Sequence, residues 1–316
     1  MPPDLAAIEQ ARRNIAGIAL RTPLVRLGVL DCAAEIYLKL ENLQPIGSFK
    51  LRGAANAMAH LSQEQLRRGV LTASAGNMAQ GVAWRARELG IPCTVIAPET
   101  APDTKTNAVK RLGASVIKVP FERWWQTFQD RSYPGIDATF IHAFDDDHVM
   151  AGNGVIGLEI LEELPEVDTV LIPWGGGGLA CGMASAIRAK NSRCKIFATE
   201  ADTAAPLAAA LSAGSVQTIA YQPSFVDGIG SKAVFPQMLA HARNLLDGSL
   251  TASLRAIAEA IRLLAERNRV IAEGAGACPV ACALSGQAGV GKIVCIVSGG
   301  NIDATKLCTI LAGQIP

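Results

Sequence analysis

Short apolar runs alternate with helix-like segments along most of this chain, and that alternation restricts the fold more than any other feature of the sequence. Buried strands are predicted at 70–73, 93–97, 115–119, 139–142, 169–173, 195–199 and 293–297. A helical segment, often preceded by a glycine-rich turn, follows most of these strands. Examples are the helices predicted at 154–163, 181–190 and 254–267, whereas no helix or strand is predicted between 201 and 248. Strands and helices that alternate at this spacing predict an α/β protein with open, mostly parallel sheets flanked by helices.

The 316 residues are enough for about two domains. The block from 51 to 141 holds about four of the predicted strands, which could form a small domain of their own. We therefore expect a small domain at 51–141 and a large domain made of 1–50 and 142–316. Asp4 and Ser62 are predicted to cap the helices that follow them.

One segment, FERWWQTFQDRSY at 121–133, is rich in aromatic residues although only 5% of the chain is aromatic. Its adjacent tryptophans are Trp124 and Trp125. The favoured interpretation is a helix packed on the small sheet, and the alternative is a segment that lines a substrate entrance.

Composition excludes several classes of function. The net charge is +1, with no acidic or basic block, so we expect no binding to nucleic acid or to an anionic membrane surface. No apolar run reaches about 18 residues and the N-terminus does not resemble a signal peptide, which predicts a soluble, cytoplasmic protein. Eight scattered cysteines without a CxxC motif predict reduced thiols rather than disulfides or a zinc site.

Lys50 lies in the stretch ENLQPIGSFKLRGA and is the first candidate for a catalytic residue. Pro45 and Gly47 precede it, and Ser48 is predicted to be the N-cap of a helix with Lys50 in its first turn. The positive end of a helix favours a neutral amine, which Schiff-base chemistry requires. The ordinary alternative is a solvated surface lysine.

Three loops follow predicted strands, at the sheet edge where α/β proteins bind ligands. The first and third are rich in small residues, and the second exposes consecutive backbone N–H donors at a helix start, as a phosphate site requires. The loops are Ser74-Ala75-Gly76-Asn77-Met78, Gly175-Gly176-Gly177-Gly178-Leu179 and Ser298-Gly299-Gly300-Asn301.

The second loop also permits a different interpretation. Gly175, Gly177 and Ala180 match the dinucleotide pattern GxGxxA, and Glu200 ends the next strand about 20 residues on, where a ribose-binding acid belongs. This alternative is a dinucleotide-dependent oxidoreductase. It leaves Lys50 and the other two loops unexplained.

The motifs SFKLRGA, TASAGNMAQGVAW, APDTKTNAVKRLGA, PWGGGGLACG and VSGGN together resemble the pyridoxal-phosphate enzymes of fold type II. The most similar branch is the threonine/serine dehydratases, with serine racemase as a near relative. Threonine synthases and cysteine synthases fit less well around Lys50. The resemblance implies the two-domain fold of the tryptophan synthase β type, with pyridoxal 5'-phosphate as cofactor.

The resemblance also implies roles for single residues. Lys50 would form the Schiff base with the cofactor and later take the Cα proton of the substrate. Ser298 would face the pyridine nitrogen, where a hydroxyl cannot fully protonate the ring and should favour β-elimination over transamination. The other cofactor contacts would come from Phe49, Asn77, Gly175, Gly176, Gly177, Gly178, Leu179 and Gly228. The substrate would be bound by Ser74, Ala75, Gly76, Asn77 and Met78, the last through its backbone.

Some positions depart from the family pattern. Ala75 replaces the second serine of the racemase loop, so we expect no efficient racemase activity. Met78 replaces the usual histidine. Glu200 and Ala204 fit the cation-site pattern ExxxAxD of some relatives, but Pro206 replaces its last acid, so no metal is assigned. The chain ends soon after SGGN, and we expect no regulatory domain of the kind found in biosynthetic threonine dehydratases.

The predicted activity is therefore α,β-elimination of water from a 3-hydroxy amino acid, giving a 2-oxo acid and ammonia. L-Threonine or L-serine is the default substrate of such a dehydratase. Met78 and the Trp124-Trp125 pair favour, as an alternative, a bulkier substrate such as phenylserine or hydroxyaspartate. A homo-oligomer, either a dimer or a tetramer, is expected.

Overall fold

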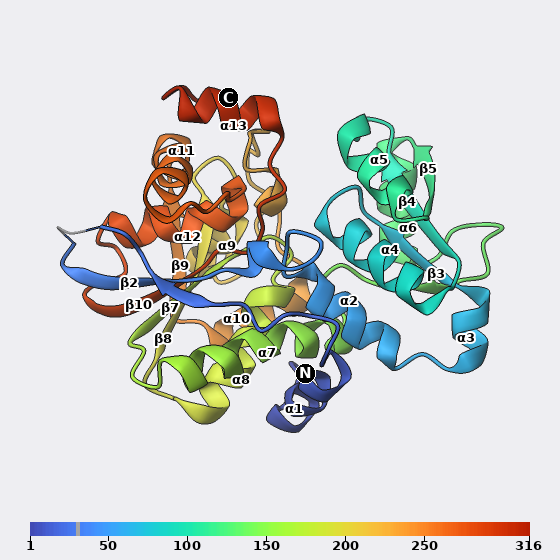
Figure 1. The fold of residues 1–316 in the computed structure, drawn as a ribbon, viewed down its shortest axis with the longest axis horizontal. Coiled ribbons are helices and arrows are strands. Elements are labelled where there is room, and N and C mark those ends of the chain that lie inside the picture. Colours follow the sequence, from blue (N-terminus) through green and yellow to red (C-terminus); the bar gives the residue numbers. More distant parts are fainter. Residues whose placement is uncertain (30–31) are drawn as a thin grey trace.

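The computed structural model describes residues 1–29 and 32–316, and its larger sheet has the strand order β1-β2-β10-β7-β8-β9 (Figure 1). Every neighbouring pair is parallel except β1 with β2, which is antiparallel. These strands are β1 (Leu24–Arg26), β2 (Ala34–Lys39), β7 (Thr169–Pro173), β8 (Lys195–Ala201), β9 (Gly248–Ala252) and β10 (Gly291–Ile296). The parallel pairing agrees with the fold class that the alternating pattern predicts.

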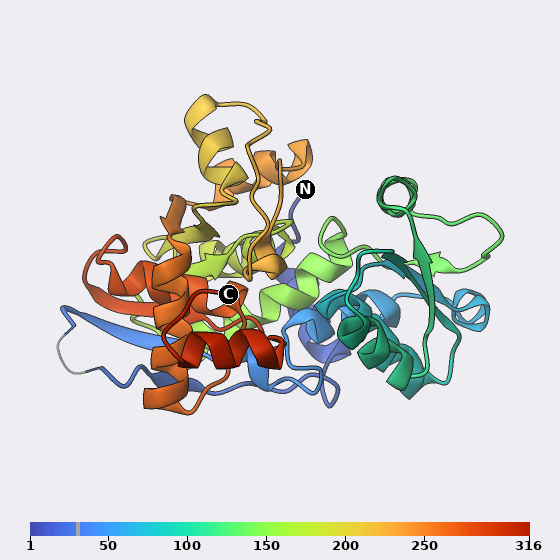
Figure 2. The same cartoon turned by 90° about the horizontal axis from the view of Figure 1, so that it is seen from above.

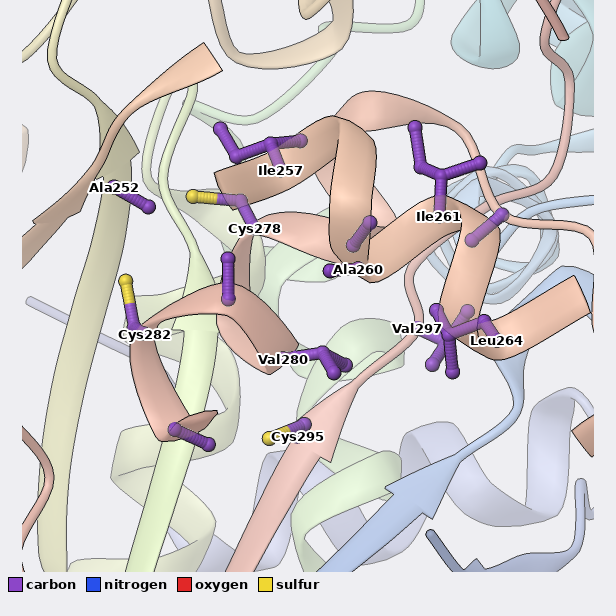
Figure 3. Packing of buried hydrophobic residues seen from close by; sticks show 14 of the residues in the cluster. Ala252, Ile257, Ala260, Ile261, Leu264, Cys278, Val280, Cys282, Cys295 and Val297 are labelled. Atoms are coloured by element: carbon purple, nitrogen blue, oxygen red, sulfur yellow. The ribbon is translucent and has the colours of Figure 1, made fainter. Parts of the chain in front are cut away.

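Both faces of this sheet are covered, as continuous apolar strands require. On β10, Ile293 and Cys295 point to one face and Val294 and Ile296 to the other. The first face packs on α11, α12 and α13, and Figure 3 shows part of that core. The second face packs on α7, α8, α9 and α10. The bounds of these helices are α7 (Asp147–Glu163), α8 (Gly178–Lys190), α9 (Pro206–Ala213), α10 (Pro236–Leu245), α11 (Leu254–Leu263), α12 (Gly274–Leu284) and α13 (Ala304–Leu311).

The smaller sheet is wholly parallel, with the order β5-β4-β3-β6. One face packs on α2 and α4 and the other on α6. Its elements are α2 (Lys50–Ala59), α3 (Gln63–Arg68), β3 (Val70–Ala73), α4 (Asn77–Leu89), β4 (Cys93–Pro98), α5 (Asp103–Arg111), β5 (Ser115–Val119), α6 (Phe121–Asp130) and β6 (Thr139–Phe140). All of these strands fall within 51–141, and the domain boundaries themselves remain a prediction.

Helix α2 lies between the elements of the two sheets, and the turned view separates the two groups of elements as well (Figures 1 and 2). It packs against α7 with almost no side chain between the two backbones. A Cβ atom on Gly152 of α7 would lie 2.5 Å from the carbonyl oxygen of Arg52, and one on Gly154 would lie 2.8 Å from that of Gly182 in α8. Glycine is therefore required for the close approach of α2, α7 and α8.

Most predicted elements are present, and the differences have local causes. Asp4 caps α1 (Leu5–Asn14), and Ser62 forms a capping box with Gln65 at α3. Helix α7 begins at Asp147, seven residues before the predicted start at 154, because its glycines hide the helical pattern. The prediction missed α9, α10, α13 and β9, which are short or rich in alanine.

The aromatic segment forms α6 and packs on the small sheet, as the favoured interpretation predicted. Trp124 joins that packed face, whereas Trp125 remains 36% exposed and its ring contacts that of Phe235 at the start of α10. The segment therefore also touches the part of the chain that carries the larger sheet.

All eight cysteines are free thiols. Within residues 1–29 and 32–316, none of the helices combines the length and apolar character needed to cross a lipid bilayer.

Candidate active site

Lys50 is the first residue of α2, and the segment before it is joined to the loop after β10. Ser48 forms an antiparallel bridge with Gly299, and the backbone N–H of Phe49 donates to the carbonyl oxygen of Ser298 at 3.0 Å. The prediction that Ser48 caps the helix is wrong. Phe49 occupies the cap position with helical dihedral angles and no side-chain cap, because the extended backbone of Ser48 is held in the bridge.

The amine of Lys50 has an unusual environment for a lysine. The residue is half-buried, and its Nζ donates to the carbonyl oxygen of Ala143 at 2.7 Å. Among the residues that the structure describes, no carboxylate forms an ion pair with this amine. Burial lowers the pKa of Lys50 from 10.5 to about 8, and the charge of Glu273 partly opposes that shift. The solvated surface lysine is thus excluded, and burial is the cause of the lowered pKa.

The first loop, at 74–78, meets the third through two amides. Asn77 begins α4, and its Oδ1 accepts from Nδ2 of Asn301 at 2.8 Å. Within the loop, the N–H of Gly76 donates to Oγ of Ser74 at 3.2 Å. The predicted Ser74, Ala75, Gly76 and Asn77 are all half-buried at the N-terminal end of α4, where backbone N–H groups favour an anion.

Met78 stands apart from that loop. Its side chain is buried in the core shared by α2, α4 and the small sheet. It cannot extend toward a ligand at the loop, so it gives no support to the expectation of a bulkier substrate. Only its backbone N–H remains a candidate contact.

The second loop, at 175–179, connects β7 to α8 and is surrounded closely by two other segments. A Cβ atom on Gly176 would lie 2.0 Å from Cδ1 of Phe144, and one on Gly178 would lie 2.6 Å from the carbonyl oxygen of Phe144. Gly177 has φ of +92°, which favours glycine. Because Phe144 follows Ala143, the segment that binds the Lys50 amine also contacts the glycine turn.

The remaining predicted cofactor contacts lie around the same turn. A Cβ atom on Gly175 would lie 3.1 Å from the carbonyl oxygen of Gly228. Leu179 is buried in the first turn of α8, and Ser298 is buried two residues after the end of β10. The structure thus brings the neighbourhoods of Lys50, the three loops and Gly228 together at one place, although the role of each residue toward a cofactor is still a prediction.

Glu273, which the sequence analysis did not single out, also belongs to this group. Its Oε1 accepts from Nδ2 of Asn77 at 2.8 Å. Burial and the charge of Asp227 raise the pKa of Glu273 from 4.5 to about 7. The sequence shows an acidic residue immediately before α12, a helix of small residues. An acid at a helix start is usually explained by its favourable interaction with the helix dipole, so it did not indicate a site residue.

The segment around Ala143 was also missed. His142 is buried, and its Nδ1 accepts the N–H groups of Phe144 and Asp145 at 3.2 and 2.8 Å. Burial lowers the pKa of His142 to about 3, so the ring is a neutral acceptor that holds this turn. No motif in the sequence marked a backbone carbonyl as the partner of Lys50.

Glu200 does not take the role that a dinucleotide site would need. Its carboxylate accepts the backbone N–H groups of Leu207 and Ala208 at the start of α9 and the hydroxyl of Ser249, each within 2.8 Å. The carboxylate of Glu200 therefore stabilises the start of α9 and is not available to bind a ribose.

Comparison with known proteins gives consistent results for nearly the whole chain. The family described as "Pyridoxal-phosphate dependent enzyme" matches residues 15–299. An L-threonine ammonia-lyase from Thermotoga maritima is 41% identical over 313 residues, which cover 97% of this chain and 78% of that protein. A catabolic L-threonine dehydratase, TdcB, from Staphylococcus aureus is 39% identical over 98% of this chain and 92% of that protein.

Solved structures of related enzymes also resemble nearly the whole chain. Maize serine racemase superposes with a TM-score of 0.91 at 32% identity, covering 99% of this chain and 98% of its own. Processed threonine deaminase isoform 2 from Solanum lycopersicum has a TM-score of 0.85 at 32% identity, with 99% and 95% covered. The fold class and the cofactor predicted from the motifs are confirmed, and the chain belongs to the pyridoxal-phosphate dependent enzymes.

Proposed function

We propose that this chain is a dehydratase that removes water from a 3-hydroxy amino acid, with L-threonine or L-serine as substrate, and releases a 2-oxo acid and ammonia. The single observation that carries the proposal is the Lys50 amine, which is partly desolvated and bonded to the backbone carbonyl of Ala143, whose neighbour Phe144 contacts the glycine turn at the start of α8. The names of the threonine ammonia-lyase and dehydratase relatives support this reaction.

The residues around Lys50 suit pyridoxal phosphate. A desolvated amine without a carboxylate partner is the group that an aldehyde requires. The N-terminus of α8 offers backbone N–H donors and a positive dipole end to a phosphate. Phe49, Asn77, Ser298 and Gly228 lie around the same place, and in our proposal they hold the ring while residues 175–179 hold the phosphate.

Pyridoxal phosphate, when bound, supplies an aldehyde for amines and an electron-withdrawing ring that stabilises negative charge at the substrate Cα. Residues 74–78 hold the substrate carboxylate with backbone N–H groups and the hydroxyl of Ser74. Lys50, whose pKa is about 8, removes the Cα proton near neutral pH. The 3-hydroxyl leaves as water and takes up one proton, which balances the proton that Lys50 removes from Cα. The enamine that results then consumes one water molecule and gives the 2-oxo acid and ammonia.

The substitution at Ala75 limits the reaction that we propose. A methyl group cannot deliver a proton to the face of Cα opposite Lys50, so inversion of the substrate should be slow. Chiral chromatography of the amino acid left after partial turnover tests this. Rapid appearance of the D-enantiomer from an L-substrate would contradict the expectation.

Two measurements test the proposed function. Purified protein should be yellow, lose that colour on treatment with borohydride, and carry the reduced cofactor mass on the peptide that contains Lys50. Ammonia release should then be assayed with L-threonine, L-serine, phenylserine and 3-hydroxyaspartate. A colourless protein that instead responds to added nicotinamide cofactor would overturn the proposal.

The oligomeric state and the location in the cell stand as separate proposals. We infer a homo-oligomer in the cytoplasm, in line with the amino-acid chemistry proposed for Lys50. Light scattering of the purified protein would test the first part, and a monomer at micromolar concentration would contradict it.

A further inference from the structure

A row of three side chains connects the Lys50 neighbourhood to the start of α12. Asn301 donates from Nδ2 both to the carbonyl oxygen of Ile46 and to Oδ1 of Asn77, each at 2.8 Å. Asn77 in turn donates from Nδ2 to Oε1 of Glu273 at 2.8 Å. The row therefore runs in one direction, from a donor at Asn301 to an acceptor at Glu273.

The direction of the row decides what Asn77 can offer to a ligand. Both N–H groups of Asn301 are used, so only the oxygen of Asn77 can face that side. A carboxylate can only accept, so the amide nitrogen of Asn77 must face Glu273. One N–H of Asn77 is left over. The Asn77 amide therefore keeps one donor for a ligand bound at this site.

The surroundings of Glu273 are shaped to hold a carboxyl group. The residue is 8% exposed, and its backbone N–H donates to the carbonyl oxygen of Gly299 at 3.0 Å. A Cβ atom on Gly299 would lie 2.6 Å from Oε1 of Glu273, and one on Gly228 would lie 3.4 Å from it. Glycine at position 299 leaves the room that the carboxyl group occupies, whereas a Cβ atom at position 228 would only touch that group.

Three charged groups from other elements act on this carboxyl. Asp227 in the turn at Asp227–Ile229 disfavours its ionised form, whereas Lys105 in α5 and Lys50 in α2 favour it. Asp227 and Lys105 also form an ion pair with each other at 2.6 Å. With burial, these influences place the pKa of Glu273 at about 7, so both protonation states are reachable near neutral pH.

We propose that Glu273 is a positioning residue: as a carboxylate it holds the Asn77 amide, together with Asn301, as the hydrogen-bond donor to the ring oxygen of bound pyridoxal phosphate, and on protonation that hold weakens. This inference rests on the proposed function, because it needs the cofactor at Lys50. A protonated carboxyl is a weaker acceptor than a carboxylate, so after protonation the orientation of the Asn77 amide depends mainly on Asn301.

The test compares Glu273→Gln and Glu273→Asp with the unchanged protein, loaded with pyridoxal phosphate, between pH 6 and 9. We expect the visible absorption spectrum of the unchanged protein to shift with a midpoint near pH 7, and the Gln variant to lack that shift. In the Gln variant a neutral hydrogen bond replaces a charge-assisted one, so the dissociation constant of this variant for the cofactor should rise roughly ten-fold. The Asp variant should restore part of the pH dependence.

Two further variants make the result specific. Asn301→Ala removes the other end of the row and should weaken cofactor binding in the same direction, which provides a test even if the Gln variant does not fold. Glu200→Gln removes a buried carboxylate that bonds the start of α9 and Ser249, away from the row, and it should lower thermal stability without moving the cofactor spectrum.

The outcomes separate the two proposals. If the cofactor spectra and dissociation constants of the Gln variant match those of the unchanged protein across the pH range, the role of Glu273 is refuted while the proposed function stands. If the unchanged protein shows neither a visible band nor a borohydride-fixed adduct on Lys50, the proposed function itself fails.

Discussion

Charged side chains near the start of α2 have two different environments. The environments differ in whether an oppositely charged side chain is bonded to them. In the first, Arg52 bonds Glu41 at 2.8 Å and Glu159 at 2.7 Å, and Lys39 bonds Glu159 at 2.8 Å. All four side chains are at most 5% exposed. We call this group the ion-pair cluster. In the second, two residues earlier on the same helix, the one hydrogen bond of the Lys50 amine within residues 1–29 and 32–316 goes to a backbone carbonyl.

The pKa values reflect this difference. In the ion-pair cluster, burial would raise the pKa of Glu41, but the charge and hydrogen bonds of Arg52, together with Thr22 and Lys39, outweigh it and the net shift is downward. At Lys50 burial prevails, and the pKa falls to about 8. A buried charge that is paired keeps its protonation state and serves the fold, whereas a desolvated amine without such a partner remains available for chemistry.

The largest effect that would break this comparison comes from Lys50→Ala. We expect ammonia release to fall by roughly 10²- to 10⁴-fold, the range typical for loss of a general base, with the chain still folded. Borohydride should then fix no cofactor on the peptide at position 50. Substantial residual turnover would show that another group does this chemistry.

Next in size is Arg52→Ala, which leaves Glu41 and Glu159 buried without their cation. Breaking a buried pair in this way typically costs about 3–5 kcal/mol of unfolding free energy. Urea denaturation measures it. Arg12→Ala is the matched control, because its pair with Glu162 is exposed and should contribute at most about 1 kcal/mol. Equal losses in the two variants would remove the distinction between the groups.

The pH dependence of cofactor loading sharpens the comparison further. The free amine of Lys50 is the reactive form, and its fraction rises as the pH increases through about 8. We expect the rate at which cofactor-free protein takes up pyridoxal phosphate, followed by absorbance, to rise with a midpoint near pH 8. A midpoint near 10.5 would mean that the amine behaves as an ordinary solvated lysine.

The smallest expected effect concerns the turn beside the amine. Gly176→Ala forces a methyl group against the ring of Phe144, an overpacking that typically costs about 1–3 kcal/mol. Cofactor affinity should drop, and adding Phe144→Ala should restore part of it. Gly28→Ala is the control, since its methyl group would meet neighbours only at 3.4 Å. Lack of any rescue would indicate that Phe144 does not set the shape of this turn.

The sequence predicted the regular parts of the molecule well for physical reasons. Strands such as 70–73 and 169–173 are continuous apolar runs bounded by polar or glycine residues, and their limits coincide with β3 and β7. Helix α7 was predicted too short, because Gly152 and Gly154 reflect contact with neighbouring backbones rather than helix propensity.

The site could be predicted only where short motifs mark it. Lys50, Asn77 and the glycine turn stand out in the sequence because their neighbours are small or break helices. Glu273 and the carbonyl of Ala143 lie 223 and 93 residues from Lys50 along the chain, by subtraction of their numbers, and nothing local connects them to it. Contacts of that kind depend on how the sheets pack, which periodicity does not encode.

The glycine contacts between α2 and α7 have a mechanical consequence. Backbone rests on backbone there, so no rearrangement of side chains can slide the helix that carries Lys50 along its neighbour. The helix that carries the amine is therefore held in a fixed position relative to the larger sheet. We expect any widening that lets a substrate approach it to come from the opposite side, by displacement of α4, α5 and the strands they cover.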